Sequence, residues 1–132
     1  MLQGIHAPMD LDERQWDTVL RLARASNLHG RLAAANLDAA SLPEVVRRHL
    51  TSSIRIAAYR TQMLREELFR LAPLCQRDYP VIVLKGAAYV LQGRRMAKGR
   101  FVSDVDLLVP FAHLNAMESR LRSAGWKPEK LT

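Results

Sequence analysis

The sequence has a single cysteine, no long apolar run and fewer acidic than basic residues. Because Cys75 has no possible partner within the chain, an internal disulfide is excluded, and we expect a small buried hydrophobic side chain at this position. No apolar run approaches the roughly 20 residues that a membrane-spanning helix needs. The first residues also lack the basic and apolar regions of a signal peptide. We therefore expect a cytoplasmic protein that has no membrane partner.

The charge balance raises the question of a phosphate-bearing partner. The 132 residues carry 20 Lys and Arg against 13 Asp and Glu, a net charge of +7, and a basic surface gains affinity for nucleic acid by releasing counterions. Most of this excess falls where we expect the outer face of a helix, so a solvated helix surface is the simpler explanation. The cluster of Arg94, Arg95, Lys98 and Arg100 differs, because it lies in a loop close to two carboxylates.

The first part of the chain has the periodicity of helices. Asp10 and Glu13 have the spacing of a capping box, and apolar residues then follow at helical spacing from Trp16. A turn around His29 ends this helix. We expect a surface or capping role for His29, because no second metal-binding side chain lies at a suitable spacing. A short helix is predicted over residues 31–37.

A long helix should follow. Ser41 and Glu44 form a second capping box with Pro43 in the first turn, and apolar side chains then keep a period of about 3.6 residues as far as Cys75. Pro80 disfavours helical geometry in the residue before it, so the helix must end by then. We interpret this helix as a scaffold that packs on the first helix and on the sheet that follows.

The periodicity changes after Pro80. Residues 81–84 predict a buried strand, followed by a tight turn at Lys85 and Gly86, a short helix and a flexible basic loop. A second strand contains the apolar run 105–109. We expect it to begin at Phe101 or Ser103 and to end before Pro110. Further along, the sequence predicts an amphipathic helix over 111–124 with Leu114, Met117 and Leu121 inside, Gly125 as its C-cap, and a third strand beginning at Trp126. This order predicts an α+β protein, with a helical segment over residues 1–78 and a small sheet with flanking helices over 79–132.

Asp104 and Asp106 carry the chemistry of the second strand. Residues two apart on a strand share a face, so their carboxylates would stand side by side and repel each other unless a cation lies between them. Mg²⁺ suits such a pair, because it is commonly held by one or two carboxylates together with phosphates. The turn at Gly86 would offer backbone amides to phosphate, and Lys85 with the loop arginines would neutralise it. These are the parts of a phosphoryl or nucleotidyl transfer site.

Each of these motifs has an ordinary structural explanation. Asp104 and Asp106 could lie on a solvent-facing edge, and Lys85 with Gly86 could form a plain β-turn. The order of strand, glycine turn, short helix, basic loop and Asp-x-Asp strand is what favours the catalytic interpretation.

The motifs Leu84-Lys-Gly-Ala-Ala88, Gly99-Arg100 and Ser103-Asp-Val-Asp-Leu-Leu-Val109 resemble those of the nucleotidyltransferase superfamily with the DNA polymerase beta fold. The chain is most similar to a bacterial family of uncharacterised nucleotidyltransferases. The motifs cover residues 81–127, and the helical N-terminal segment is also similar. The resemblance implies that residues 79–132 form part of a nucleotidyltransferase core with a mixed sheet.

The resemblance also implies roles for individual residues. Asp104 and Asp106 would be catalytic and would bind Mg²⁺. The nucleotide phosphates would be bound by Lys85, Gly86, Ala87, Arg100 and Ser103. Ala87 stands where many members of the superfamily have a serine that contacts phosphate, although alanine is usual in this branch. The substrate would be an NTP, with ATP as the expected nucleotide, and the acceptor hydroxyl is not identified.

One part of the superfamily site is missing. The superfamily generally uses a third carboxylate on a later strand, and Glu129 lies too near the end of the sequence to supply it. We interpret the sequence as part of a longer protein, since the sheet is also incomplete. The alternatives are a catalytically inactive fold that binds a protein or nucleic acid, and a structural helical domain without a ligand. An incomplete sheet edge and a long apolar helix would also suit a homodimer.

Overall fold

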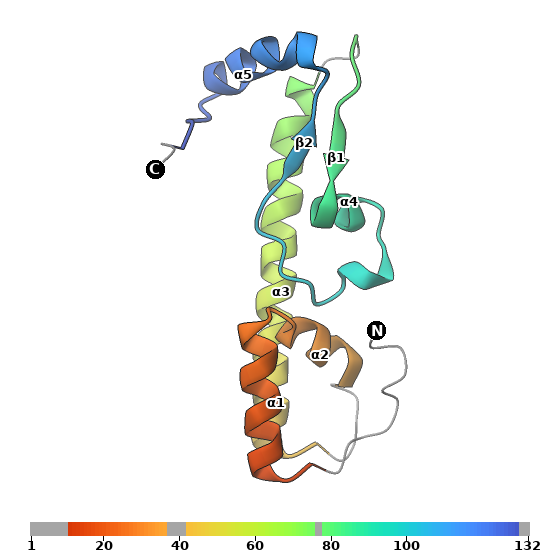
Figure 1. The fold of residues 1–132 in the computed structure, drawn as a ribbon, viewed down its shortest axis with the longest axis vertical. Helices are drawn as coiled ribbons and strands as arrows, with labels where there is room; N and C mark the ends of the chain where they lie inside the picture. The colour runs from red at the N-terminus through yellow and green to blue at the C-terminus, as the bar shows by residue number, and fades with distance from the viewer. Residues whose placement is uncertain (1–10, 37–41, 76–77, 130–132) are drawn as a thin grey trace.

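The computed structural model describes residues 11–36, 42–75 and 78–129, which form helices and one small sheet (Figure 1). In chain order the elements are α1 (Glu13–Ala25), α2 (His29–Asn36), α3 (Glu44–Leu71), the 3₁₀ helix η2 (Ala72–Leu74), β1 (Ile82–Leu84), α4 (Lys85–Leu91), η3 (Arg95–Ala97), β2 (Asp106–Leu108), η4 (Phe111–His113) and α5 (Leu114–Ser123). This confirms the predicted α+β class. No helix among the described residues is long and apolar enough to cross a membrane.

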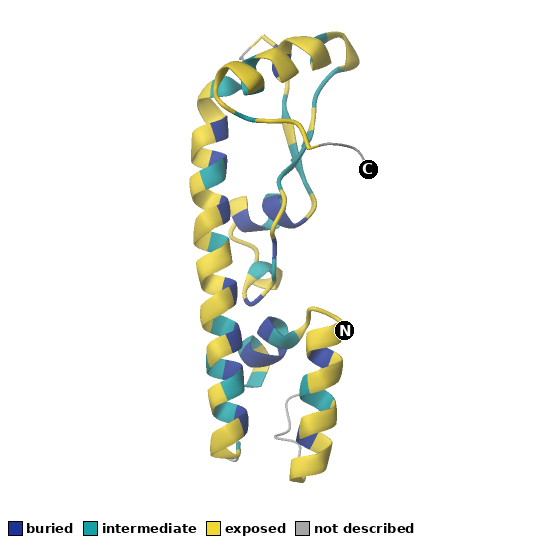
Figure 2. Ribbon diagram, turned by 90° about the vertical axis from the view of Figure 1, so that its left-hand side faces the viewer, coloured by how far each residue is buried: buried dark blue, intermediate teal, exposed yellow. Residues whose placement is uncertain are grey.

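Helix α3 is the axis of the molecule (Figure 1). Its 28 residues correspond to a length of about 42 Å. Helix α2 lies against the N-terminal half of α3, with α1 on the other side of α2, whereas β1, β2 and α4 lie beside its C-terminal half, with α5 near its end (Figures 1 and 2). The buried residues of α3 face these other elements, and its opposite side is exposed (Figure 2). The predicted role of this helix as a scaffold is confirmed.

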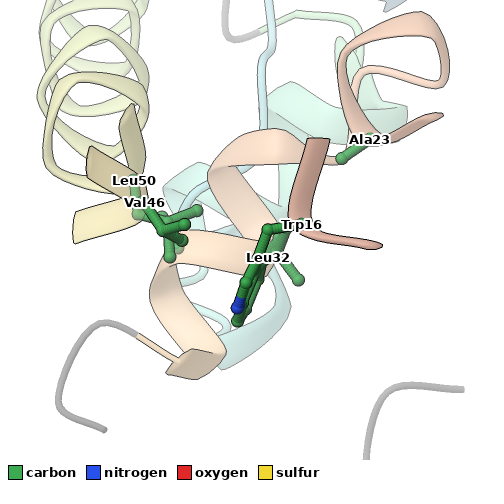
Figure 3. Packing of buried hydrophobic residues seen from close by; sticks show 6 residues of the cluster. Trp16, Ala23, Leu32, Val46 and Leu50 are labelled. Carbon is green, nitrogen blue, oxygen red and sulfur yellow. The ribbon is translucent and has the colours of Figure 1, made fainter. Parts of the chain in front are cut away.

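The first hydrophobic core joins α1 and α2 to the start of α3 (Figure 3). Trp16 of α1, Leu32 of α2, and Val46 and Leu50 of α3 are buried together, and Leu50 has no exposed surface. Val19 and Leu20 pack against this cluster, as the helical spacing after Trp16 predicts. The predicted apolar stripe of α1 therefore faces the core.

The second core attaches the strands and α4 to the other half of α3. Leu64 and Leu68 of α3 pack with Ala87 and Val90 of α4 and with Val102. Val102 belongs to the segment that leads into β2. Since both cores are built on one helix, the division of the chain at residue 78 stays a prediction.

The sheet has two antiparallel strands in the part of the chain that the structure describes. Ile82 lies opposite Leu108, Val83 opposite Leu107, and Leu84 opposite Asp106. The prediction of a mixed sheet with a third strand at Trp126 is wrong for the described residues, because 126–129 form neither helix nor strand. The prediction that the first strand is buried is also wrong at Ile82, which is 51% exposed.

Several predicted boundaries differ from the structure. Helix α1 is capped by Asp12, whose carboxylate accepts from the Gln15 amide while the Gln15 side chain accepts from the Asp12 amide. The capping box is therefore two residues later than predicted, and Asp10 lies outside the described residues. Helix α3 begins after Pro43 without a side-chain cap, and Ser41 is also outside the described residues.

His29 is neither a surface nor a capping residue. It is the first residue of α2, and its half-buried ring stacks on Phe101 with 4.1 Å between the ring centroids. Burial is the main cause that lowers the His29 pKa, with the charges of Arg24 and Arg60 acting in the same direction and the nearby backbone of Ala23 opposing them. The ring therefore helps to pack α2 against the segment before β2.

The C-terminal helix follows the predicted pattern only in part. Met117 is buried, but Leu114 is 48% exposed, so the prediction that Leu114 lies inside is wrong. Gly125 has a φ of 99°, and the Trp126 amide donates to the Leu121 carbonyl at 2.9 Å. This is the Schellman arrangement, which confirms Gly125 as the residue that ends α5. Cys75 is half-buried just after η2, beyond the end of the long helix.

Candidate functional site

The junction between β1 and α4 holds the first of the predicted site residues. Lys85 has a φ of 56°, in the left-handed region that residues other than glycine rarely adopt. This conformation costs about 1–2 kcal/mol. It turns the chain from β1 directly into α4, so that α4 begins at Lys85 itself.

Lys85 forms an ion pair with Asp106. The distance from Lys85 Nζ to Asp106 Oδ2 is 3.0 Å, and the two side chains are 74% and 44% exposed. The register of the sheet explains the pair, because Asp106 lies opposite Leu84, the residue before Lys85. An ion pair this exposed contributes at most about 1 kcal/mol to the stability of the fold. Its importance is that it joins two residues of the predicted site. The fold brings the two predicted motifs into contact.

Asp104 differs from Asp106 in its position. Asp106 is the first residue of β2, whereas Asp104 lies two residues before the strand and is exposed. The alternation of side chains along a strand therefore does not apply to Asp104, and the predicted strand geometry of the pair is corrected. Asp104 has no ion pair or hydrogen bond among the described residues. Its carboxylate is available to an external cation.

Gly86 and Ala87 lie in the first turn of α4, not in a separate glycine turn. A Cβ added at Gly86 would lie 2.8 Å from Val102 Cγ2, so a glycine is needed here for packing. Ala87 is 1% exposed within the second core. Gly86 is buried as well, so both residues serve the packing of α4 rather than an open surface.

Arg100 and Ser103 lie on the segment between the basic loop and β2. The Arg100 guanidinium lies over the Tyr89 ring, 5.3 Å from its centroid, and so packs this segment against α4. Ser103 is exposed and lies just before Asp104. The structure therefore places all seven predicted site residues on two consecutive segments, 84–87 and 100–106, and links them directly through Lys85 and Asp106.

The residues fit a divalent cation in part. Asp104 and Asp106 supply exposed carboxylate oxygens, and Asp106 already accepts a cationic partner in Lys85. Mg²⁺ is commonly bound by one or two carboxylates when a substrate supplies phosphate oxygens. No group of three or more His, Cys, Asp or Glu side chains that could hold a metal is found among the described residues.

The loop after α4 is more ordered than the sequence predicts. Arg31 of α2 donates from Nη1 to the Lys98 carbonyl at 2.7 Å and to the Arg95 carbonyl at 3.4 Å. Gly99, with a φ of 77°, packs backbone to backbone against Gly30. Sequence reasoning missed Arg31, and no local signal marks it, because its acceptors lie 64 and 67 residues away.

Comparison with known proteins gives one family. The sequence matches the family described as uncharacterised nucleotidyltransferase over residues 12–132. Neither the curated proteins nor the solved structures gave a match. The match includes α1, α2 and α3 as well as the segments that carry the predicted site.

Proposed function

Because the chain belongs to the family of uncharacterised nucleotidyltransferases, we propose that it contributes the nucleotide-binding part of a nucleotidyltransferase of the DNA polymerase beta superfamily. In this reaction the acceptor hydroxyl oxygen bonds to the α-phosphorus of an NTP, ATP being the expected nucleotide. The bond from that phosphorus to pyrophosphate breaks, and the hydroxyl proton passes to solvent or to a base. The observation that carries the proposal is the contact between Lys85 and Asp106.

Each residue of the site has a role in this proposal. Asp104 and Asp106 would hold Mg²⁺, which would polarise the phosphate and favour attack by the hydroxyl. Gly86 and Ala87, which are buried, would shape the turn against which the phosphates pack. Lys85, which pairs with Asp106, would supply its ammonium charge to the phosphates. Arg100 and Ser103 add a charge and a hydroxyl beside Asp104.

A second candidate is an inactive fold that acts as an interaction module. The observation that favours it is the absence of a third carboxylate near Asp104 and Asp106 within the described part of the chain. The Lys85 ammonium would then be a permanent substitute for the metal. Binding of a partner would need neither NTP nor Mg²⁺.

Calorimetric titration of ATP in the presence and absence of Mg²⁺ tests the first proposal. We expect Mg²⁺-dependent binding by the wild type, and its loss when Asp104→Ala and Asp106→Ala are combined. The matched control combines Asp17→Ala and Asp78→Ala, two exposed carboxylates outside residues 84–106, and should bind as the wild type does. Unchanged binding in the Asp104 and Asp106 variant would refute the proposed metal site.

A further inference from the structure

Two pockets lie on either side of the basic loop. The first has a volume of about 360 Å³ and lies between α3 and the loop, where Arg65, Arg94 and Lys98 surround an apolar floor that includes Val90. The second has a volume of about 650 Å³ and is lined by Arg94, Arg95 and Lys98. Among the residues that the structure describes, no carboxylate lines either pocket. Cations gathered without counter-charges favour an anionic ligand.

The cations around these pockets have no carboxylate partner among the described residues. Arg94 donates from Nε to the Gln92 side-chain oxygen at 3.0 Å. The charged groups of Arg65, Arg95 and Lys98 have no ion pair or hydrogen bond within the described ranges. Other exposed arginines are paired along their own helices, as in the pairs Arg21–Asp17, Arg48–Glu44 and Arg122–Glu118. The charged groups of Arg14, Arg55 and Lys127 also have no ion pair or hydrogen bond among the described residues. What distinguishes Arg65, Arg95 and Lys98 is that they line adjoining hollows.

The loop holds its cations on a fixed support. The hydrogen bonds from Arg31 to the Lys98 and Arg95 carbonyls tie the loop backbone to α2. The close contact of Gly30 with Gly99 adds a second attachment. Because the backbone is anchored, a ligand does not have to order the loop when it binds.

A third hollow continues the surface along α3. It has a volume of about 610 Å³ and shares Gln62 and Arg65 with the first pocket. Phe69, one turn beyond Arg65, lines this hollow and is 82% exposed. Glu66 also lines it, and its Oε1 accepts from Gln62 Nε2 at 3.4 Å. An exposed aromatic ring beside a row of cations is the arrangement on which single-stranded nucleic acids stack their bases.

We propose that single-stranded nucleic acid binds along a basic track formed by Arg65, Phe69, Arg94, Arg95 and Lys98. The three hollows share lining residues, so a strand can pass from one to the next, whereas a single nucleotide fills only one of them. The phosphates contact the cations and a base stacks on Phe69. In a duplex the bases are already stacked on each other and cannot reach this ring. The bound strand would also supply the acceptor hydroxyl, and this part of the proposal rests on the proposed function. The binding of the strand to the track does not rest on it.

Fluorescence anisotropy with a labelled 12-nucleotide oligoadenylate RNA tests the track, without NTP or Mg²⁺. Combining Arg65→Gln with Lys98→Gln should weaken binding roughly tenfold at 0.15 M salt, and should reduce the slope of log K against log salt by about 1.4. Phe69→Ala should weaken binding at least about fivefold. Because these side chains are exposed, circular dichroism should show that all variants stay folded.

The control separates the track from a general effect of charge. Combining Arg14→Gln with Arg55→Gln removes the same charge from exposed positions that line none of the three hollows, and should change affinity by less than about threefold. An equal loss in this control, full affinity in Phe69→Ala, or equally tight binding of a 12-base-pair RNA duplex would each overturn the proposal. Alanine substitutions at Asp104 and Asp106 should not weaken the RNA complex. RNA binding by a protein that fails to bind Mg²⁺ and ATP would refute the proposed function and leave the track standing.

Discussion

Replacing Gly30 with alanine tests how the basic loop is held in place. A Cβ at Gly30 would overlap the Gly99 carbonyl oxygen, and would lie 2.9 Å from the Gly99 carbonyl carbon and 3.0 Å from Phe101 Cε2. Two of these three atoms belong to backbone, which cannot rotate away as a long side chain can. The loop and α2 must therefore separate by roughly 1 Å.

The expected change in stability is the balance of opposing effects. Alanine in place of glycine within a helix gains up to about 1 kcal/mol. Overpacking of a close contact costs about 1–3 kcal/mol, and weakening the charged hydrogen bond from Arg31 to the Lys98 carbonyl costs about 1.5 kcal/mol more. We therefore expect Gly30→Ala to lower the free energy of unfolding by about 2 kcal/mol, although alanine has the higher helix propensity.

Urea denaturation followed by circular dichroism measures this change. The midpoint for Gly30→Ala should be about 1 M lower than that of the wild type. Gly93→Ala is the control, because Gly93 has a φ of 62° but open space around its Cβ position, so only the backbone cost of about 1 kcal/mol applies. RNA binding by Gly30→Ala should also weaken, since the loop cations lose their support. A midpoint at or above the wild-type value would refute this account of the contact.

Three further predictions concern stability. The folded-state pKa of His29 lies below its ordinary value of 6.5, so its contribution to stability is fully present above pH 6.5 and is lost as the pH falls below that value. The urea midpoints at pH 7.5 and pH 5.5 should therefore differ more for the wild type than for His29→Phe. Equal differences in the two proteins would contradict this. The Lys85→Gly variant should be about 1 kcal/mol more stable than Lys85→Ala, the reverse of the order in a right-handed helix. If thermal melting showed the alanine variant to be the more stable, residue 85 would not have a left-handed conformation. Leu50→Ala should cost about 2–5 kcal/mol in urea denaturation, because Leu50 is fully buried in the first core, and a cost below 1 kcal/mol would contradict that burial.

The elements that follow a simple period were predictable from the sequence. The apolar spacing from Val46 to Leu68 identified α3, and the stripe beginning at Trp16 identified the buried face of α1. Helix starts were less predictable, since Asp10 and Asp12 are both good capping residues and differ only through the reciprocal bond to Gln15. Such local choices depend on small energy differences that a spacing rule does not contain.

The candidate site was predictable as a set of residues but not as a geometry. The sequence assigned Lys85 and Asp106 to the same site, and the antiparallel register of β1 and β2 explains why their side chains are in contact. The need for glycine at position 86 depends on how α4 packs against Val102, which no local pattern encodes. The left-handed conformation of Lys85 was likewise not marked by the sequence, because lysine rarely adopts it. A third strand at Trp126 was wrong because Trp126 is the one large apolar residue in 126–129, and Pro128 cannot donate a hydrogen bond to a neighbouring strand.

Because α3 contributes to both hydrophobic cores, the number of residues between them is constrained. Inserting one residue between Leu50 and Leu64 would rotate one core relative to the other by about 100° around the helix axis. An insertion of seven residues would nearly restore the angle, but it would move the cores apart by about 10 Å. The contact of Gly30 with Gly99 would then be lost, because one glycine moves with each core. Helix α3 therefore acts as a ruler for this contact, and deletions or insertions in it should be far less tolerated than substitutions on its exposed face.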